Sequence, residues 1–262
     1  MARAERRAVL VGYLPAGFPS VDGAVEAMAA MVAAGVDVVE VGLPYSDPLM
    51  DGPVIQAAVQ HALAAGCRTA DVLATVERVA AATGAPTLVM SYWNPIERYG
   101  AARFAADLAA AGGAGAIAPD LTPEEAGEWL AACAKHDLDP VFLVAPSSSE
   151  QRLRTVSDAT GGFVYAASTM GVTGARESVG TTASRLVARV RAVTTTPVAV
   201  GLGVGTGEQA AEVAGYADGV IVGSALVRCL LDAPDPAAGV AAVRALAGEL
   251  AAGVRRGRPS PG

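Results

Sequence analysis

Short apolar runs alternate with longer amphipathic segments along nearly the whole chain. Each run is rich in Val, Ile and Leu, and each is followed by an Ala-rich segment whose apolar residues recur at helical spacing. This alternation is typical of consecutive strand–helix units around a parallel sheet. The predicted strands are residues 9–13, 38–43, 87–91, 115–118, 141–145, 163–167, 198–200 and 220–222.

Helices are predicted in the segments between these strands. They cover residues 21–34, 54–65, 69–82, 101–111, 123–136, 149–159, 178–193, 207–214, 224–231 and 237–252. One start signal is the pair Thr122-Pro123, which supplies a capping threonine and a proline at the first helical position.

Eight strand–helix units in 262 residues predict an α/β protein of the (β/α)8 TIM-barrel class. We expect one catalytic domain over residues 1–254, followed by a poorly ordered tail at 255–262. An open, doubly wound sheet is the alternative, but the first strand is not followed by Gly-x-Gly-x-x-Gly.

Two of the predicted strand-to-helix loops are longer than the others. They are residues 44–53 after the second strand and residues 169–181 after the sixth. In a barrel such loops lie at the C-terminal face of the sheet, where active sites are built. Loops of this length are typical of mobile segments that close over an active site.

Composition narrows the classes of function. The chain is 52% hydrophobic, which suits one large core, and its net charge of -7 argues against a nucleic-acid surface. No apolar run has the length and freedom from glycine and charge of a membrane span, and no cleavable apolar segment precedes the first strand. We therefore expect a cytoplasmic protein. Three distant cysteines, Cys67, Cys133 and Cys229, indicate reduced thiols.

Glu40 is an acid inside the apolar run Val38-Val39-Glu40-Val41. Such a run predicts a strand buried on both faces, where an unpaired charge is disfavoured. Burial should raise the pKa of Glu40 and allow it to hold or deliver a proton near neutral pH. The alternative is a structural glutamate whose charge is satisfied by backbone amides or an arginine. A second acid, Asp51, follows in the long second loop.

Glycines cluster after the last three predicted strands, in Gly171-Val172-Thr173-Gly174, Gly201-Leu202-Gly203 and Gly223-Ser224. Glycine lets a phosphate approach the backbone, amides donate to it, and a helix N-terminus adds partial positive charge. Each motif alone is equally consistent with an ordinary turn. Together, at the matching ends of neighbouring strands, they favour a phosphate site.

Other side chains exclude some chemistry. The only lysine, Lys135, ends a predicted helix, which argues against a Schiff base. His61 and His136 lie on predicted helices without neighbouring ligands, so no metal site is expected. The remaining candidate catalytic side chains at the C-terminal face of the predicted barrel are carboxylates and hydroxyls: Glu40, Asp51, Asp47, Asp120, Tyr13, Tyr92, Tyr165, Ser224 and Thr173. We interpret Asp47 and Asp120 as turn residues. The other carboxylates and hydroxyls, together with the predicted phosphate site, predict proton transfer on a phosphorylated substrate.

The segment 39–56 resembles the signature around the two catalytic acids of the tryptophan synthase α-subunit family. Tyr92-Trp93-Asn94-Pro95 and the three glycine motifs follow in the order and spacing of that family, so the resemblance runs from Val9 to Leu231. It implies a lyase that cleaves indole-3-glycerol phosphate to indole and glyceraldehyde 3-phosphate by a retro-aldol reaction. No cofactor is implied for this chain; pyridoxal phosphate is expected only on a partner β subunit.

The resemblance also implies roles for single residues. Glu40 would be the general acid/base at the indole ring carbon and the glycerol hydroxyl, Asp51 would bind the indole nitrogen, and Tyr165 would lie close to Glu40. The remaining implied positions are Gly174, Gly203, Gly223 and Ser224 for the phosphate, Thr173 for closure over Asp51, and Tyr13, Ile117 and Leu202 for the indole pocket.

Two positions depart from the family pattern: many relatives have an aspartate where Phe18 stands, and some have an arginine in place of Thr169. The implied partner is the β subunit, in an α2β2 assembly. This chain would contact the β subunit through residues 44–53 and 94–99. Three alternatives remain: a free-standing lyase, a catalytically silent activator of the β subunit, and another phosphate-binding barrel such as an isomerase. The last leaves the Asp51 loop unexplained.

Overall fold

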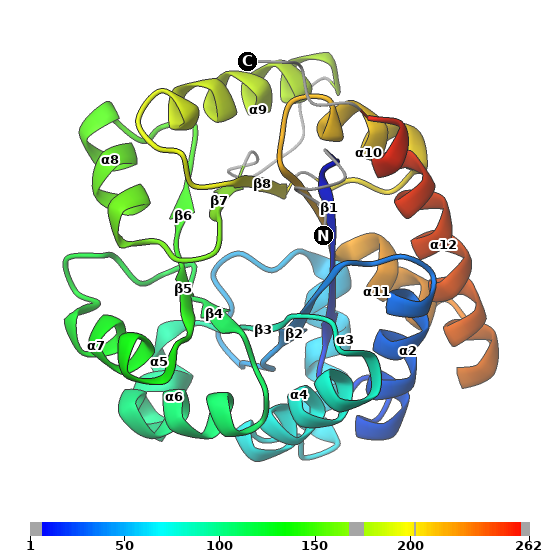
Figure 1. Cartoon of the computed structure of the whole chain (residues 1–262). Helices are drawn as coiled ribbons and strands as arrows, with labels where there is room; N and C mark the ends of the chain where they lie inside the picture. The colour runs from blue at the N-terminus through cyan, green and yellow to red at the C-terminus, as the bar shows by residue number, and fades with distance from the viewer. Residues whose placement is uncertain (1–6, 168–175, 202, 258–262) are drawn as a thin grey trace.

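The described strands form one closed, parallel sheet. The computed structural model describes residues 7–167, 176–201 and 203–257. The strands are β1 (Val9–Pro15), β2 (Val38–Gly42), β3 (Thr87–Met90), β4 (Gly115–Ile117), β5 (Asp139–Val141), β6 (Leu143–Val144), β7 (Val164–Ala167), β8 (Val198–Gly201) and β9 (Gly219–Val222). Their order is β5-β4-β3-β2-β1-β9-β8-β7-β6, so the two ends of the sheet are consecutive in the chain. The (β/α)8 barrel is thereby confirmed (Figure 1).

The fifth predicted strand differs from the expectation because it is divided at Phe142. Its first part, β5, pairs with β4, whereas its second part, β6, pairs with β7. The Phe142 carbonyl accepts from the Tyr165 amide, and the Phe142 side chain is 1% exposed. The chain therefore passes from one neighbouring strand to the other at this residue, which closes the barrel.

Helices surround the sheet on its outer side (Figure 1). They are α2 (Val21–Ala33), α3 (Pro53–Ala64), α4 (Thr69–Thr83), α5 (Trp93–Tyr99), α6 (Ala101–Ala110), α7 (Gly127–His136), α8 (Glu150–Ala159), α9 (Arg176–Arg191), α10 (Gly207–Ala214), α11 (Ser224–Leu231) and α12 (Pro236–Arg256). Helix α5 was not predicted, because it is short and contains a proline. Helix α9 begins inside the predicted sixth loop.

The prediction that Thr122 caps a helix starting at Pro123 was wrong. Residues 122–126 form turns, and α7 begins only at Gly127. The Thr122 hydroxyl donates to the Glu125 carboxylate at 2.8 Å, and Glu124 pairs with Arg152 of α8. These side-chain contacts hold the segment against α8 as a turn, so the local capping signal is overridden.

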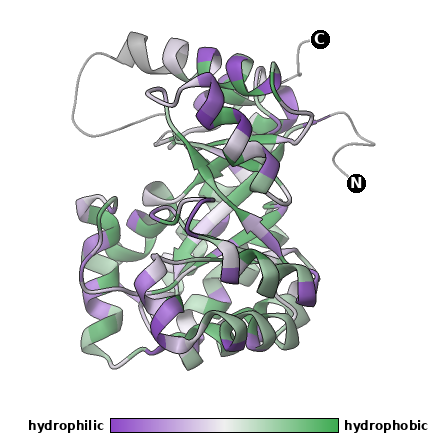
Figure 2. Cartoon of the chain, turned by 90° about the vertical axis from the view of Figure 1, so that its left-hand side faces the viewer, coloured by the Kyte–Doolittle hydropathy of each residue, from purple (hydrophilic) through white to green (hydrophobic). Residues whose placement is uncertain are grey.

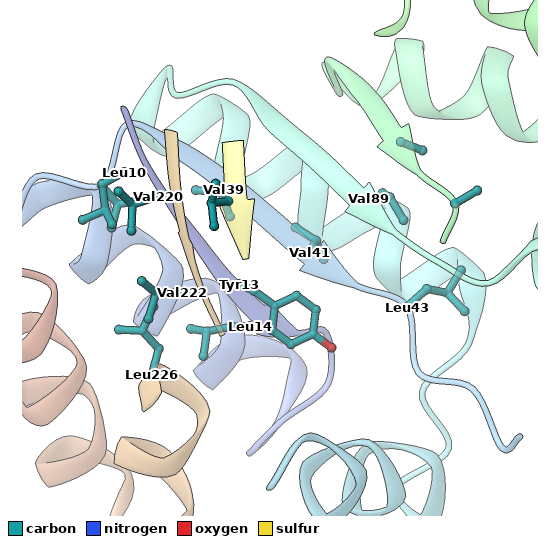
Figure 3. Close-up of a cluster of buried hydrophobic side chains, with 14 of the residues drawn as sticks. Leu10, Tyr13, Leu14, Val39, Val41, Leu43, Val89, Val220, Val222 and Leu226 are labelled. Carbon is teal, nitrogen blue, oxygen red and sulfur yellow. The ribbon is translucent and has the colours of Figure 1, made fainter. Parts of the chain in front are cut away.

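Side chains of the strands alternate between two apolar layers. One layer lies between the sheet and the helices and includes Leu10, Leu14, Val39 and Val222, which belong to the same buried cluster as Leu226 of α11 (Figure 3). The other fills the barrel interior and contains, among others, Val11, Leu88, Ile117, Val141, Ala199 and Ile221. Figure 2 shows this distribution as hydrophobic strands enclosed by helices that carry hydrophilic residues. Positions 40 and 42 alternate with the outward-facing Val39 and Val41, so they face the interior.

Helix α12 is long and apolar enough to pass a length-and-composition test for a membrane span, the one described helix that does. It lies against α2, α10 and α11 and buries Val243, Leu250 and Val254. Gly253 meets the backbone of Gly207 closely, which allows α10 to pack against it. It is therefore a core helix of the barrel's outer layer. Its last residues, Arg255 and Arg256, had been assigned to the tail; residues 258–262 lie outside the described part.

Candidate active site

A pocket of about 220 Å³ opens at the C-terminal end of the strands. Its walls come from the interior faces of β1, β2, β3, β6, β7, β8 and β9 and from the segments that follow β2, β8 and β9. The predicted residues that line it are Tyr13, Glu40, Asp51, Tyr165, Gly203, Gly223 and Ser224. Side chains from distant parts of the sequence thus meet in one cavity.

Glu40 lies on β2 between Tyr13 of β1 and Leu88 of β3 in the sheet register. Its side chain faces the barrel interior and is 1% exposed, and its Oε1 atom has no hydrogen-bond partner among the described residues. Burial raises the pKa of Glu40 to about 8. The predicted burial is confirmed, and neither backbone amides nor an arginine satisfies that oxygen within the described part.

Two tyrosines flank Glu40, each lying over a glycine of the next strand. Tyr13 of β1 pairs with Glu40 of β2 in register. Gly42 lies two residues after Glu40 on β2, and a Cβ atom there would overlap the Tyr13 hydroxyl. Tyr165 pairs with Ala199, and a Cβ atom two residues further on, at Gly201, would meet its hydroxyl in the same way. Burial and the nearby Glu40 carboxyl raise the pKa of Tyr165.

Burial also raises the pKa of Tyr13, with the Asp51 and Glu40 carboxyls adding to the effect. Both phenols therefore stay protonated at neutral pH. The floor of the pocket offers hydroxyl donors on either side of the buried acid, and the two glycines make the room for these rings.

Asp51 ends the loop that follows β2 and is half-buried. The Tyr92 hydroxyl donates to its Oδ1 at 3.0 Å and accepts from the Met50 amide at 2.9 Å. Burial raises the pKa of Asp51, and the hydrogen bond from Tyr92 opposes that shift. The two acids thus have different surroundings: Glu40 is desolvated and its Oε1 has no partner in the described part of the chain, whereas Asp51 is held by a donor.

Other contacts hold the same loop in place. The Gln56 side chain of α3 donates to the Asp51 carbonyl at 2.8 Å, and Asn94 of α5 donates to the Tyr45 hydroxyl at 2.8 Å. Between these anchors, Leu49 and Met50 are 75% and 47% exposed. Two large apolar side chains therefore project into solvent beside the pocket.

Gly203, Gly223 and Ser224 lie at the opposite side of the pocket. Gly203 has a φ of 65°, a left-handed conformation that favours glycine. Gly223 precedes α11, whose first residue is Ser224, and a Cβ atom at position 223 would lie 3.2 Å from the Tyr13 ring. The first amides of α11 have no partner within the helix and can donate to an anion.

The remaining predicted positions are less informative. Ile117 is fully buried in the interior cluster with Leu88 and Val141; it pairs in register with Met90, a pocket-lining residue, but does not itself line the pocket. Thr169, Thr173, Gly174 and Leu202 lie outside the described residues.

Phe18, which departs from the family pattern, is 4% exposed. Its ring meets the edge of His61 of α3 at a centroid distance of 5.3 Å. The first strand-to-helix loop is therefore packed against α3 through this side chain.

Sequence reasoning named Tyr92 as a candidate reagent but missed its contact with Asp51, and it missed the clearance that Gly42 provides. A glycine two residues after Glu40 was the available signal. Asp120 behaves as the structural residue we expected, because it accepts from the Trp93 amide at the start of α5. In residues 7–167, 176–201 and 203–257 there is no group of three His, Cys, Asp or Glu side chains that could hold a metal ion.

Comparisons with known proteins agree with this geometry. A family model described as Tryptophan synthase alpha chain matches residues 1–255. The chain is 64% identical to the tryptophan synthase alpha chain of Salinispora arenicola over 254 residues, covering 97% of this chain and 95% of the relative. It is 61% identical to that of Streptomyces avermitilis over 256 residues, covering 98% and 92%.

A solved structure of Mycobacterium tuberculosis tryptophan synthase superimposes with a TM-score of 0.90 at 57% identity, covering 97% of this chain and 95% of that chain. The similarity extends over nearly the full length of sequence and structure alike. The chain belongs to the tryptophan synthase alpha chain family.

Proposed function

We propose that this chain cleaves indole-3-glycerol phosphate to indole and glyceraldehyde 3-phosphate, with Glu40 as the acid/base and Asp51 as the group that binds the indole nitrogen. The observation that carries this assignment is the environment of Glu40. Its carboxyl is buried, it has a pKa of about 8, and it shares one pocket with Asp51 and the glycine turn before α11. A carboxyl in that state can give and take protons at neutral pH.

The reaction breaks the bond between the indole ring carbon and the hydroxyl-bearing carbon of the glycerol chain. The electron pair of this bond stays with the ring carbon, which gains a proton, while the chain hydroxyl loses a proton and becomes the aldehyde. No net proton is consumed, so one group that donates to the ring and accepts from the hydroxyl is sufficient. Glu40 has that capacity because its pKa lies near neutrality.

Asp51 is suited to the second role because the Tyr92 hydroxyl donates to its carboxylate and so favours the charged form, against the effect of burial on its pKa. A carboxylate near the indole nitrogen accepts its N–H and stabilises positive charge as the ring carbon is protonated. Two carboxyls with different surroundings can thus divide the acid/base and electrostatic work. Gly203, Gly223 and Ser224 would hold the phosphate at the other side of the pocket, with the first amides of α11 as donors.

No cofactor is needed by this scheme, since every proton and electron pair is moved by the substrate and the chain's own side chains. Pyridoxal phosphate would belong to the partner β subunit. We place the protein in the cytoplasm, where the rest of amino-acid biosynthesis would supply its substrate.

Asp51→Asn is expected to lower kcat/KM by about 10- to 100-fold, less than the loss at Glu40, because the amide keeps a hydrogen-bond acceptor but loses the charge. Steady-state indole release by the purified chain measures this effect. Asp47→Asn in the same loop serves as the control, since Asp47 is not a pocket-lining residue. A loss larger than that of Glu40→Gln would reverse the assigned roles.

The β subunit of an α2β2 assembly is the proposed partner, and the C-terminal face is the proposed contact. Leu49 and Met50 project from residues 44–53, and α5 lies beside them through the Asn94–Tyr45 hydrogen bond. Exposed apolar side chains next to an active site are typical of a protein interface. We expect Leu49→Ala with Met50→Ala to weaken the complex by about tenfold or more, measured by titration calorimetry. Unchanged affinity across a series of alanine substitutions at 44–53 and 94–99 would defeat this placement.

One assay tests the function itself: the purified chain is mixed with indole-3-glycerol phosphate, and indole is measured with and without the β subunit. A subunit of the synthase should be slow alone and accelerate when the partner is added. Equal rates in both mixtures would indicate a free-standing lyase. Binding of a stable substrate mimic without any cleavage, even with the partner present, would indicate a silent activator.

A further inference from the structure

Tyr92 bridges two consecutive residues of the loop that carries Asp51. Its single hydroxyl accepts from the Met50 backbone amide at 2.9 Å and donates to the Asp51 carboxylate at 3.0 Å. One contact fixes the backbone just before the acid, and the other fixes the acid's side chain. The Gln56 side chain also donates to the Asp51 carbonyl, whereas the Leu49 and Met50 side chains are exposed.

The Tyr92 side chain is itself held firmly. It is 6% exposed, and its ring lies against that of Tyr45 with the centroids 5.6 Å apart. Its backbone is the N-cap of α5, and the next amide, that of Trp93, donates to Asp120 at 2.8 Å. A buried ring on an anchored backbone presents its hydroxyl at one position, so the hydroxyl can orient a group on a less well packed loop.

The protonation of Tyr92 is consistent with its hydroxyl orienting the Asp51 carboxylate. Burial raises the pKa of Tyr92 to about 12, so its hydroxyl remains a donor throughout the neutral range. Donation to Asp51 opposes the upward shift in the pKa of that carboxyl. The other titratable groups that line the pocket with Asp51 are Glu40, Tyr13 and Tyr165.

We propose that Tyr92 is a positioning residue whose hydroxyl sets the place and orientation of the Asp51 carboxylate for binding an indole N–H. It does not contact the reacting atoms; it acts through Asp51. This inference rests on the proposed function, because it assumes that Asp51 meets the indole ring. Tyr92 lies in the segment between β3 and α5, so the Asp51 carboxylate would be held by a residue from outside its own loop.

A double-mutant cycle in ligand binding tests the proposal. The probe is indole propanol phosphate, which has the ring and the phosphate but lacks the hydroxyls that react, and its Kd is measured for the full chain. Tyr92→Phe should weaken binding about tenfold when Asp51 is present. In an Asp51→Ala background the same change should alter Kd by less than about twofold, since the group it positions is gone.

Tyr216→Phe is the matched control. It removes another phenolic hydroxyl, one that is buried and has no hydrogen-bond partner among the described residues, and Tyr216 does not line the pocket. Its Kd should equal that of the parent chain. Equal weakening by Tyr92→Phe in both backgrounds would show that Tyr92 acts through general packing, and no weakening in the parent background would overturn the proposal outright.

Two further measurements separate positioning from a structural role. The acid limb of the kcat/KM profile should move to higher pH in Tyr92→Phe, because the lost donor no longer opposes the rise in the pKa of Asp51, and it should stay unchanged in Tyr216→Phe. Hydrogen exchange of the Met50 amide should become faster in Tyr92→Phe only. The exchange and binding experiments do not depend on turnover, so a chain that fails to cleave the substrate would refute the proposed function without deciding this inference.

Discussion

Glu40→Gln is expected to reduce indole release by about 1,000-fold while the chain stays folded. The amide has nearly the shape of the carboxyl but cannot exchange a proton, and the structure offers no second acid buried beside it on the interior faces of the described strands. The measurement is kcat for indole-3-glycerol phosphate cleavage with the proposed β-subunit partner present. Glu77→Gln, on an exposed position of α4, is the matched control and should keep full activity.

The same variant has a second, independent readout in stability. The pKa of Glu40 is raised from 4.5 to about 8 in the folded chain. Between these two pH values the unfolded chain binds fewer protons at this position than the folded chain, so the parent loses stability as pH rises through this window. In Glu40→Gln, residue 40 does not ionise and makes no pH-dependent contribution to stability. Its free energy of unfolding relative to the parent should therefore increase from pH 4.5 to pH 8 and level off outside that range.

Chemical denaturation at a series of pH values measures this difference. A flat difference between the variant and the parent would mean that Glu40 is ionised in the folded chain at neutral pH. Full activity of Glu40→Gln would mean that another acid does the work, and the proposed mechanism would be wrong.

Gly42→Ala is expected to lower kcat/KM by about 100-fold through displacement of Tyr13. The new Cβ atom would overlap the Tyr13 hydroxyl and ring, and on the other side the ring already lies close to Gly223. Because Tyr13 lines the pocket, a displaced ring would change the shape of the site. We also expect a loss of about 1–3 kcal/mol in the free energy of unfolding, the usual cost of overpacking a buried site.

The measurements are steady-state kinetics and denaturation of the purified chain. Gly127→Ala is the control, because a Cβ atom there meets no other atom within 4 Å and alanine favours the helix that begins at this residue. Adding Tyr13→Leu to Gly42→Ala should recover part of the stability, since a shorter side chain removes the overlap. If Gly42→Ala is as active and stable as the parent chain, Tyr13 does not depend on this clearance.

Much of the fold could be predicted because the pattern of the chain is strong and local. Each strand is a short Val-, Ile- and Leu-rich run, and a strand buried on both faces needs little context to be recognised. The failures were at positions where distant contacts decide. Phe142 divides a strand because its two parts pair with different strands, and Glu124 holds the segment after Thr122 as a turn because it pairs with Arg152 of α8.

The chemical character of the site could also be predicted, for a comparable reason. An acid within an apolar strand must be buried if the strand is, so the raised pKa of Glu40 follows from its immediate neighbours. The glycines after β8 and β9 could be assigned to one end of the barrel, because parallel strands align their C-terminal ends.

By itself, the sequence determined the barrel, the two acids and the end of the barrel at which they meet, since these depend on periodicity and on burial within single strands. Only the tertiary structure decided how the acids are held. The overlap of Tyr13 with position 42, and of Tyr165 with position 201, depends on the register between neighbouring strands. The hydrogen bond from Tyr92 to Asp51 joins residues 41 positions apart, and no local pattern encodes a contact that forms only when separate strand–helix units close into one ring.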